Sequence, residues 1–435
     1  MRIFLIENKI TQKLKGLENS GFCKFICSAQ KSDVDVEKTV LEIIKTVRKK
    51  NDAALISYCN KFDKTKFKKA GDLLVSAAEI SAAEKSLPRE IKDALKLSFA
   101  RIKAYHEKQL PKDFSFKDEI GVTLGNHWRA IDSIGVYVPG GTASYPSSVL
   151  MSAVPAMVAG VKNISICAPT SAGKINPAVL YAAKICGIKT IYKIGGAQAV
   201  AALAYGTNVV EKVDKIVGPG NSFVATAKKI VFGDVGIDMI AGPTDVTIIA
   251  DKTSNAAWIA ADALSQLEHG IDSKAFIITN CEQLALRVST EIAYLKTTLP
   301  REKIIDESLK NSAIFVIKNL DEAAHLANFI APEHLQIACK NAQKFLPKIQ
   351  NAGAIFLGEY TPESIGDYTA GPSHTLPTSA TAKFASGLSV YDFLKRISLI
   401  SCDKNSFEKL AKATSILADC EGLHAHKLSI DIRKK

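Results

Sequence analysis

The segment SIGVYVPGG, residues 133–141, decides the fold class of this chain. Residues 133–138 are rich in β-branched and aromatic side chains, which predicts a strand, and the Pro-Gly-Gly that follows predicts a tight turn. Similar short runs recur along the chain and alternate with Ala-rich, helix-forming stretches such as 198–205 and 255–267. This alternation predicts βαβ units with right-handed crossovers, and therefore open, largely parallel sheets.

Other segments also have the composition expected of strands. They are residues 163–168, 190–194, 215–217, 246–250, 276–279, 314–317 and 354–356. This number of strands in a chain of 435 residues favours two sheets rather than one. The first 120 residues differ, because they are polar and carry apolar side chains at helical spacing, as in 34–51.

The composition is that of an ordinary globular protein, with 47% hydrophobic and 23% charged residues. The most apolar stretch, 149–161, is too short to span a bilayer, and no secretory signal opens the chain. Nine scattered cysteines, an odd number, argue against a secreted disulfide framework. We therefore expect a cytoplasmic protein without a membrane partner.

The net charge of +12 raises the question of a nucleic-acid partner. The lysines between positions 45 and 69 are mixed with acidic residues, and no recognised nucleic-acid motif accompanies them. The pattern favours a solvated basic surface that helps to attract an anionic cofactor or substrate, and we expect no nucleic-acid partner.

Glycine-rich turns follow several predicted strands, at 138–141, 194–198, 217–221 and 241–244. Glycine lets the backbone approach a phosphate closely, and a helix that begins at such a turn attracts an anion. No turn has the glycine spacing of dinucleotide-binding domains, so each one also fits a simple strand-to-helix connection. Their clustering in one region favours an anion site.

Four segments in the second half of the chain concentrate nitrogen and oxygen donors and contain no cysteine, namely 265–269, 331–334, 366–368 and 421–426. This donor set predicts a zinc-assisted active site rather than a structural zinc knuckle. Gln266 and His269 are three residues apart in a helical stretch, which places them on one face, as in a packed core pair. Asp367 also fits a turn residue.

Glu333 and His334 follow Ala331-Pro332, which predicts an ordered turn or a helix start. A neighbouring Glu and His can divide water activation and proton removal between them. The alternative is that Glu333 is only a first-turn carboxylate that faces a helix dipole.

The order and wording of eight blocks resemble the histidinol dehydrogenase family over almost the whole chain. The blocks are residues 135–141, 195–199, 218–221, 241–243, 266–270, 331–335, 366–368 and 421–427. The resemblance implies a zinc-dependent, four-electron oxidation of L-histidinol to L-histidine through bound L-histidinaldehyde. It also implies two NAD per reaction, one Zn²⁺ per subunit and a place as the last step of histidine biosynthesis.

The resemblance assigns roles to individual residues. Glu333 would activate water, and His334 would be the general base for both oxidation steps. The implied zinc ligands are Gln266, His269, Asp367 and His426, the last supplied by the partner subunit of a homodimer. The implied NAD contacts are Tyr137, Gln198 and Asn221. The substrate contacts are the zinc ligands and the catalytic pair together with Thr244, His374 and Glu421.

The family fold implies two incomplete Rossmann-like, parallel-sheet domains of the aldehyde-dehydrogenase type. We expect a helical N-terminal extension over 1–32, a first α/β domain made of 33–136 and 244–388, and an inserted NAD-binding domain over 137–243. A C-terminal segment, 389–435, would reach into the active site of the partner subunit. Thr244-Asp245 stands where the family usually has Ser-Glu, and His424 stands where Thr or Pro is usual.

Three alternatives remain open. A relative of the family could oxidise another amino or hydroxy alcohol on the same scaffold. A metal-free aldehyde dehydrogenase would need a nucleophilic cysteine, and neither Cys281 nor Cys339 lies in a glycine-rich nucleophile context. A basic nucleic-acid-binding protein would use its glycine turns to hold backbone phosphates, with a steep salt dependence.

Overall fold

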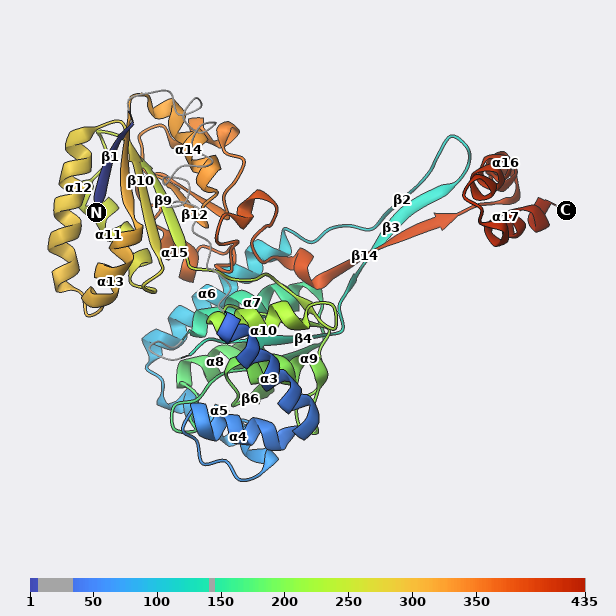
Figure 1. Cartoon of the computed structure of the whole chain (residues 1–435), viewed down its shortest axis with the longest axis horizontal. Helices are drawn as coiled ribbons and strands as arrows, with labels where there is room; N and C mark the ends of the chain where they lie inside the picture. Colours follow the sequence, from blue (N-terminus) through green and yellow to red (C-terminus); the bar gives the residue numbers. More distant parts are fainter. Residues whose placement is uncertain (7–33, 141–144, 435) are drawn as a thin grey trace.

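The computed structural model describes residues 1–6, 34–140 and 145–434. Two parallel sheets, each flanked by helices, lie next to each other, and an arm projects from between them (Figure 1). The α/β class with two separate parallel sheets, predicted from the sequence, is confirmed. No helix in the described ranges is both long and apolar enough to cross a membrane.

The larger sheet has six strands, all parallel, in the order β1-β11-β10-β9-β12-β13. The strands are β1 (Arg2–Ile6), β9 (Asp245–Ala250), β10 (Lys274–Thr279), β11 (Ala313–Ile317), β12 (His334–Ile337) and β13 (Ala354–Leu357). From β9 the chain moves outward through β10 and β11, and then returns to the other side of β9 for β12 and β13. This reversal next to the first strand is the switch point of a Rossmann-type sheet.

Helices cover both faces of this sheet, and side chains of β9 pack into the hydrophobic cluster on each face. The helices are α11 (Ala256–Leu267), α12 (Glu282–Leu295), α13 (Glu302–Ser308), α14 (Ala323–Ile330) and α15 (Glu363–Tyr368). Ile248 packs in the cluster that contains residues of α11 and α12, whereas Ile249 packs with residues of α14. Successive residues of a strand point to opposite faces, so β9 is buried along its whole length.

The smaller sheet has five parallel strands in the order β6-β5-β4-β7-β8. They are β4 (Ser133–Tyr137), β5 (Asn163–Cys167), β6 (Thr190–Tyr192), β7 (Lys215–Val217) and β8 (Gly236–Ile237). The connecting helices are α7 (Pro146–Ala159), α8 (Pro177–Ile185), α9 (Gly196–Tyr205) and α10 (Ser222–Val231). The strand order repeats that of the larger sheet, with the switch point between β4 and β7.

The N-terminal helices pack against the smaller sheet. They are α3 (Val34–Lys50), α4 (Asp52–Phe62), α5 (Ala77–Ser86) and α6 (Arg89–Glu107). Helix α3 contacts α9 and α10, α5 contacts α8, and α6 contacts α7. The apolar stripe of α3, which includes Val40 and Ile44, shares one buried cluster with Val200 and Leu203 of α9. The prediction that 33–136 belongs with the larger sheet is therefore wrong for these helices.

The N-terminus also differs from the expected helical extension over 1–32. Arg2–Ile6 forms an edge strand that pairs in parallel with Ala313–Ile317. Residues 7–33 lie outside the described residues. A short apolar run next to a sheet edge gains backbone hydrogen bonds that a helix of this length would not retain.

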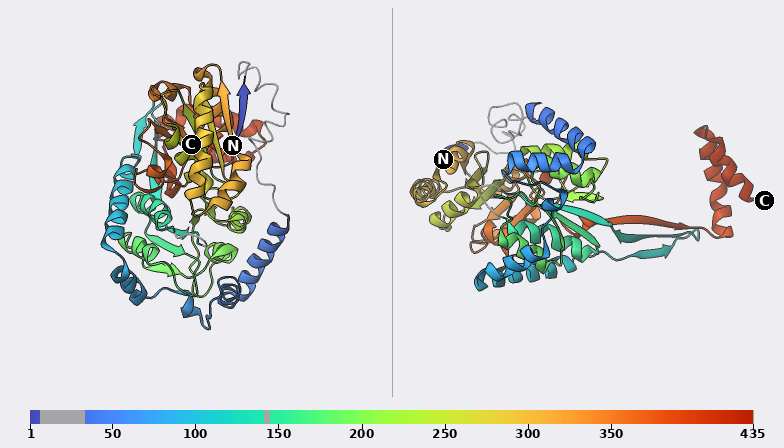
Figure 2. Two further views of the ribbon diagram at one scale, coloured as in Figure 1. Left: turned by 90° about the vertical axis from the view of Figure 1, so that its left-hand side faces the viewer. Right: turned by 90° about the horizontal axis from the view of Figure 1, so that it is seen from below.

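The arm is an antiparallel sheet that carries two helices at its tip (Figures 1 and 2). Its strands, in the order β14-β3-β2, are β14 (Leu394–Ser401), β3 (Thr123–Ala130) and β2 (Phe114–Lys117). The tip consists of α16 (Lys404–Cys420) and α17 (His424–Asp431). Apolar side chains on this arm are exposed, among them Ile400 (71%) and Leu428 (62%), as on a surface that another chain covers.

A buried ion pair fixes the turn at the switch point of the smaller sheet. Lys228 pairs with Asp238, and their side chains are 2% and 0% exposed. Lys228 also donates to the Gly218 carbonyl oxygen (3.0 Å), while Asp238 accepts from the Gly218 N–H (2.7 Å). Gly218 has φ +113°, and a Cβ atom there would lie 2.1 Å from the Tyr137 carbonyl oxygen. The pair therefore holds the turn after β7 against the end of β4.

Replacing Lys228 should destabilise this half of the protein. Lys228→Met leaves the buried Asp238 carboxylate without its cation, and we expect the free energy of unfolding to fall by about 3–5 kcal/mol. The matched control is Lys229→Met on the same helix, which is exposed and should change stability by less than about 0.5 kcal/mol. Chemical denaturation followed by circular dichroism measures both. Equal stability of the two variants would show that the pair does not hold the turn.

Candidate active site

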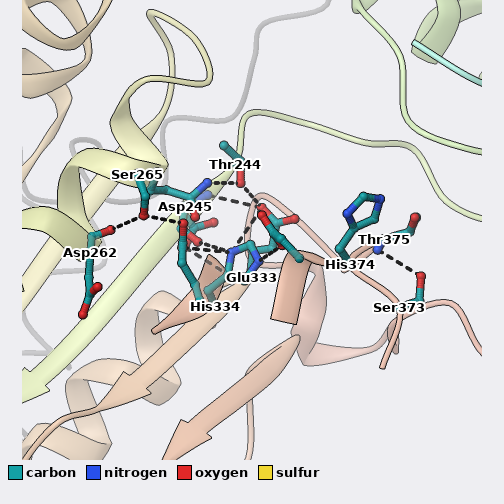
Figure 3. Close-up of polar contacts among 12 residues, drawn as sticks. Thr244, Asp245, Asp262, Ser265, Glu333, His334, Ser373, His374 and Thr375 are labelled. Carbon is teal, nitrogen blue, oxygen red and sulfur yellow. Dashed lines mark hydrogen bonds and ion pairs between the residues drawn. The ribbon is translucent and has the colours of Figure 1, made fainter. Parts of the chain in front are cut away.

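Two of the donor-rich segments, 265–269 and 331–334, meet near the amino-terminal ends of β9 and β12 (Figure 3). Asp367 of the third segment contacts His334 of the second. Thr244 lies immediately before β9, and Glu333 lies immediately before β12, which begins at His334. Because β9 and β12 are parallel neighbours, with His334 paired to Val246, their first residues lie side by side. Ligands of open α/β sheets usually bind at the carboxyl ends of the strands, so this cluster occupies the opposite edge.

Glu333 and His334 are held by a strained connection between α14 and β12. Ala331 ends α14 with φ +50°, an uncommon value for a residue with a side chain. The Gly353 N–H donates to the Pro332 carbonyl oxygen (2.9 Å), which ties this connection to β13. The predicted ordered turn is confirmed. Glu333 leads into a strand and is not a first-turn carboxylate of a helix.

Thr244 links the catalytic carboxylate to the Gln266 amide. The Thr244 hydroxyl lies 2.5 Å from Glu333 Oε2 and also hydrogen-bonds the Gln266 amide. The Asp245 N–H donates to Glu333 Oε2 (3.3 Å), and the Glu333 N–H donates to Asp245 Oδ2 (3.3 Å). All four residues are largely buried, with Gln266 only 1% exposed. Threonine thus supplies the hydroxyl that the family usually takes from serine.

His334 lies among three carboxylates. Its Nδ1 is 3.9 Å from Glu333 Oε2 and from Glu363 Oε2, and its Nε2 is 3.7 Å from Asp367 Oδ1. Burial lowers the pKa of His334, but Glu333, Asp367 and Glu363 together raise it to about 10. Burial raises the pKa of Glu333 to about 7, against the lowering effects of His334 and Thr244. A carboxyl group with this pKa can accept a proton near neutrality.

Glu363 is a part of this cluster that the sequence analysis did not single out. Its side chain is 1% exposed, and it accepts a hydrogen bond from Ser265 Oγ (2.9 Å). With its amide nitrogen turned toward Glu363, Gln266 donates to Oε1 of that carboxylate (3.3 Å). Burial raises the pKa of Glu363 to about 8. Its position four residues before Asp367, on the same helix face, was the available sequence signal.

The donors expected to hold zinc converge only in part. Helix α11 ends at Leu267, so Gln266 lies in its last turn and His269 just beyond the helix, while Asp367 lies in α15. Burial lowers the pKa of His269, although Asp367 raises it. Burial raises the pKa of Asp367, but His334, His374 and His269 lower it overall. Both groups are therefore deprotonated near neutrality, the form in which a metal binds them.

The remaining expected ligand lies far from this cluster. His426 and Glu421, which was expected to contact the substrate, are exposed at the tip of the arm. They lie at or beside α17, whose label stands at the far end of Figure 1. Within the described ranges, no three His, Cys, Asp or Glu side chains lie at metal-binding spacing. Of the four expected zinc ligands, the described part of one chain brings Gln266, His269 and Asp367 to the cluster, whereas His426 lies apart from it. The donor chemistry fits zinc, and the set is incomplete within one chain.

His374 joins this cluster to the smaller sheet. Its Nε2 lies 3.4 Å from Ser148 Oγ, in the first turn of α7, the helix that follows β4. Burial lowers the pKa of His374, although Asp367 raises it. The amino edge of the larger sheet therefore faces the carboxyl edge of the smaller one.

A cavity of about 1010 Å³ opens at that carboxyl edge. Tyr137, Gln198 and Asn221, the residues expected to contact NAD, all line it. The Tyr137 hydroxyl oxygen accepts from the Gly196 N–H (3.0 Å), and the Asn221 side chain caps α10 by accepting from the Val224 N–H (3.2 Å). We call this space the cofactor cavity.

Two glycines beside the cofactor cavity serve packing. A Cβ atom at Gly140 or Gly195 would lie 2.4 or 2.5 Å from the ring of Pro169, which follows β5. The turns after β4, β5 and β6 therefore meet at Pro169. For these two positions the structure supports a tight connection rather than the direct approach of a phosphate.

Comparison with known proteins gives a consistent result. The family model for histidinol dehydrogenase matches residues 27–434. The chain is 48% identical over 413 residues to histidinol dehydrogenase of Brucella abortus (strain 2308), covering 95% of this chain and 96% of that relative. It is 49% identical over 415 residues to that of Rhodopseudomonas palustris, with the same coverage. The crystal structure of histidinol dehydrogenase from Elizabethkingia anophelis superposes with a TM-score of 0.92 at 37% identity, covering 99% of this chain and 98% of the other.

The hydroxyl of Thr244 should stabilise the ionised form of Glu333. Thr244→Val keeps the shape but removes this bond, and we expect it to lower the free energy of unfolding by about 1.5–3 kcal/mol at pH 8. The loss should be smaller at pH 5, below the Glu333 pKa of about 7, where the carboxyl group is protonated. Thr244→Ser, which keeps the hydroxyl, is the matched control. Denaturation of metal-free protein measures the effect, and equal losses in both variants would contradict the role of the hydroxyl.

Proposed function

This chain belongs to the histidinol dehydrogenase family, and we propose that it oxidises L-histidinol to L-histidine with two NAD as hydride acceptors and one zinc ion per subunit. This is the last step of histidine biosynthesis. The observation that carries the proposal is the buried Glu333–His334 pair, which lies beside the donors Gln266, His269 and Asp367. The zinc, the NAD stoichiometry and the residue roles are parts of this proposal, as is a cytoplasmic location.

The two catalytic residues divide the proton transfers. His334 accepts the proton of the substrate alcohol when its carbon loses the first hydride, which gives the aldehyde. Glu333 accepts a proton from water while the water oxygen bonds to the aldehyde carbon. The aldehyde oxygen takes the proton that His334 gained in the first step, which gives the neutral hydrate and returns His334 to its base form. His334 accepts a proton from the hydrate when the second hydride leaves, which gives the acid. Both oxidations take place at one buried pair, so the aldehyde is kept from solvent.

The metal donors have a second effect on the base. A zinc ion held by Gln266, His269 and Asp367 would orient the imidazole and amine of histidinol and, as a nearby cation, would lower the pKa of His334. Asp367 is one of the carboxylates that raise this pKa. A base works best when its pKa lies near the working pH, so the same carboxylate serves both metal binding and the tuning of His334.

The position of the cofactor cavity supports its assignment to NAD. The cavity lies at the carboxyl ends of β4 to β7, which includes the switch point where open α/β sheets bind nucleotides. Tyr137, Gln198 and Asn221 line it from the turns after β4, β6 and β7. The protein's contribution is to position the acceptor, since the hydride chemistry belongs to the nicotinamide.

The arm supports a homodimer with shared active sites. His426 and Glu421 are exposed at its tip, at a distance from the cluster of their own chain. The exposed apolar side chains of the arm favour burial against a second copy. We propose that each arm supplies Glu421 and His426 to the active site of the other subunit.

The alternatives have less support. Burial raises the pKa of Cys339 to about 11, so its thiol is not the ready nucleophile that a metal-free aldehyde dehydrogenase needs. Cys281 follows β10 at its carboxyl end, away from the cluster at the amino ends of β9 and β12. A relative acting on another alcohol would have to use the same donors and His374. No feature of the described residues adds support to the nucleic-acid hypothesis.

The stoichiometry of NADH is the direct test. With limiting L-histidinol, excess NAD and added zinc, purified enzyme should form two NADH per histidinol. Chelation should abolish the reaction and zinc should restore it, because the substrate is oriented by the metal. One NADH per histidinol would mean that oxidation stops at the aldehyde and would refute the role of Glu333. No NADH at all would favour a relative with another substrate.

Shared active sites predict complementation between two inactive chains. His426→Ala should lose zinc and activity, and His424→Ala, two residues earlier in the same helix, is the matched control that should keep both. Heterodimers of a His426→Ala chain and a His334→Ala chain should recover part of the activity, because one of their two sites has an intact set of residues. Verified heterodimers without activity would count against sharing.

A further inference from the structure

Asp63 lines the cofactor cavity from outside the sheet. It caps the carboxyl end of α4, one of the helices that pack on the smaller sheet. Its Oδ2 atom is fully buried without a hydrogen-bond partner, and no described residue forms an ion pair with the side chain. Burial raises the pKa of Asp63 to about 6. Asp63 as a whole is partly exposed, but a carboxylate oxygen that is buried without a partner is costly, and such groups concentrate at binding sites.

The loop that presents Asp63 is fixed by its own hydrogen bonds. Asn60 Oδ1 accepts from Thr65 Oγ1 (2.6 Å) and from the Phe67 N–H (2.8 Å), while Asn60 Nδ2 donates to the Phe67 carbonyl oxygen (2.9 Å). The Asp63 N–H donates to the Cys59 carbonyl oxygen (2.9 Å). The carboxylate is thus held in place before any ligand arrives, which lowers the entropic cost of binding.

Thr170 supplies a second unpaired polar group to the same cavity. It lies in the turn after β5, and its hydroxyl oxygen is buried without a hydrogen-bond partner. Because β5 is the second strand of this Rossmann-type sheet, its end is where an acidic residue usually binds the 2′-hydroxyl of the adenosine ribose. The residues after β5, Ala168 to Ser171, contain no acid. Asp63 therefore supplies the cavity with the carboxylate that the turn after β5 lacks.

We propose that Asp63 and Thr170 bind the hydroxyl groups of the adenosine ribose of NAD, and that Asp63 makes the enzyme prefer NAD over NADP. The inference rests on the proposed use of NAD. A carboxylate accepts hydrogen bonds from a ribose diol, whereas the 2′-phosphate of NADP would meet it as a like charge. Lys64 and Lys174 also line the cavity and are exposed. They attract phosphate in either dinucleotide, so the discrimination falls to Asp63.

The test measures dinucleotide binding without histidinol, by fluorescence titration of the zinc-loaded full-length enzyme with NADH and NADPH. The wild-type enzyme should bind NADH more tightly. Asp63→Asn keeps the shape and removes the charge, and it should lower the preference for NADH about tenfold or more. Asp63→Ser should act in the same direction. Thr170→Val should weaken NADH binding about fivefold.

The control variant is Glu211→Gln. Glu211 is an exposed carboxylate in the domain of the smaller sheet and does not line the cavity, so this variant should leave the dissociation constants of NADH and NADPH unchanged. If the wild type binds NADH and both Asp63 variants keep its preference, this inference fails while the use of NAD stands. A wild-type preference for NADPH would also overturn it. If the wild type binds neither dinucleotide, the proposed function fails as well, so the two failures are distinguishable.

Discussion

The positive charge of His334 among buried carboxylates is the interaction on which the active site depends. Glu333, Glu363 and Asp367 lie within 4 Å of its ring nitrogens. Burial raises the pKa values of Glu333 and Glu363, to about 7 and about 8, because ionised carboxylates are poorly solvated there. One imidazolium offsets this cost and keeps the pKa of Asp367 below its ordinary value. Proton acceptors and a metal-binding carboxylate can therefore exist side by side in one buried site.

The two sheets have the same strand order but contribute opposite edges. The larger sheet offers the amino ends of β9 and β12, whereas the smaller sheet offers its carboxyl edge and the cofactor cavity. The contact of Ser148 with His374 joins the two edges. In the proposed mechanism this arrangement separates proton transfer from cofactor binding. The base, His334, would act from the larger sheet, and the smaller sheet would hold the hydride acceptor. The buried Lys228–Asp238 pair serves the second task, because it fixes the Gly218 turn against β4.

Buried parallel strands and glycine turns have distinctive compositions, and local sequence patterns therefore predicted the two sheets. The roles of the individual site residues followed from the family resemblance and stay predictions. The segment 133–141 and the similar strand-like runs that alternate with helical stretches were enough to predict βαβ units. The stripe of Val40 and Ile44 showed that α3 is buried, but an apolar stripe does not specify its partner, so these helices were placed with the wrong sheet. Glu363 was missed because a single glutamate in a helix has no motif, and its role depends on Ser265 and His334, which lie far away in the sequence.

In the proposed dimer, the active site is complete only after two chains have associated, because the arm of one chain supplies residues to the other. Gln266, His269 and Asp367 belong to the body of one chain, whereas His426 is at the arm tip, so the proposed fourth zinc donor is available only when two chains associate. A ligand that binds the assembled form and not the separate chains stabilises the assembly by mass action. Zinc and dimerisation would then favour each other, since the coupling between two binding events is reciprocal. The exposed apolar side chains of the arm, such as Ile400, would be covered in the same event that completes the metal site. In the proposed dimer, association of the two chains and completion of the metal site would thus be one linked equilibrium.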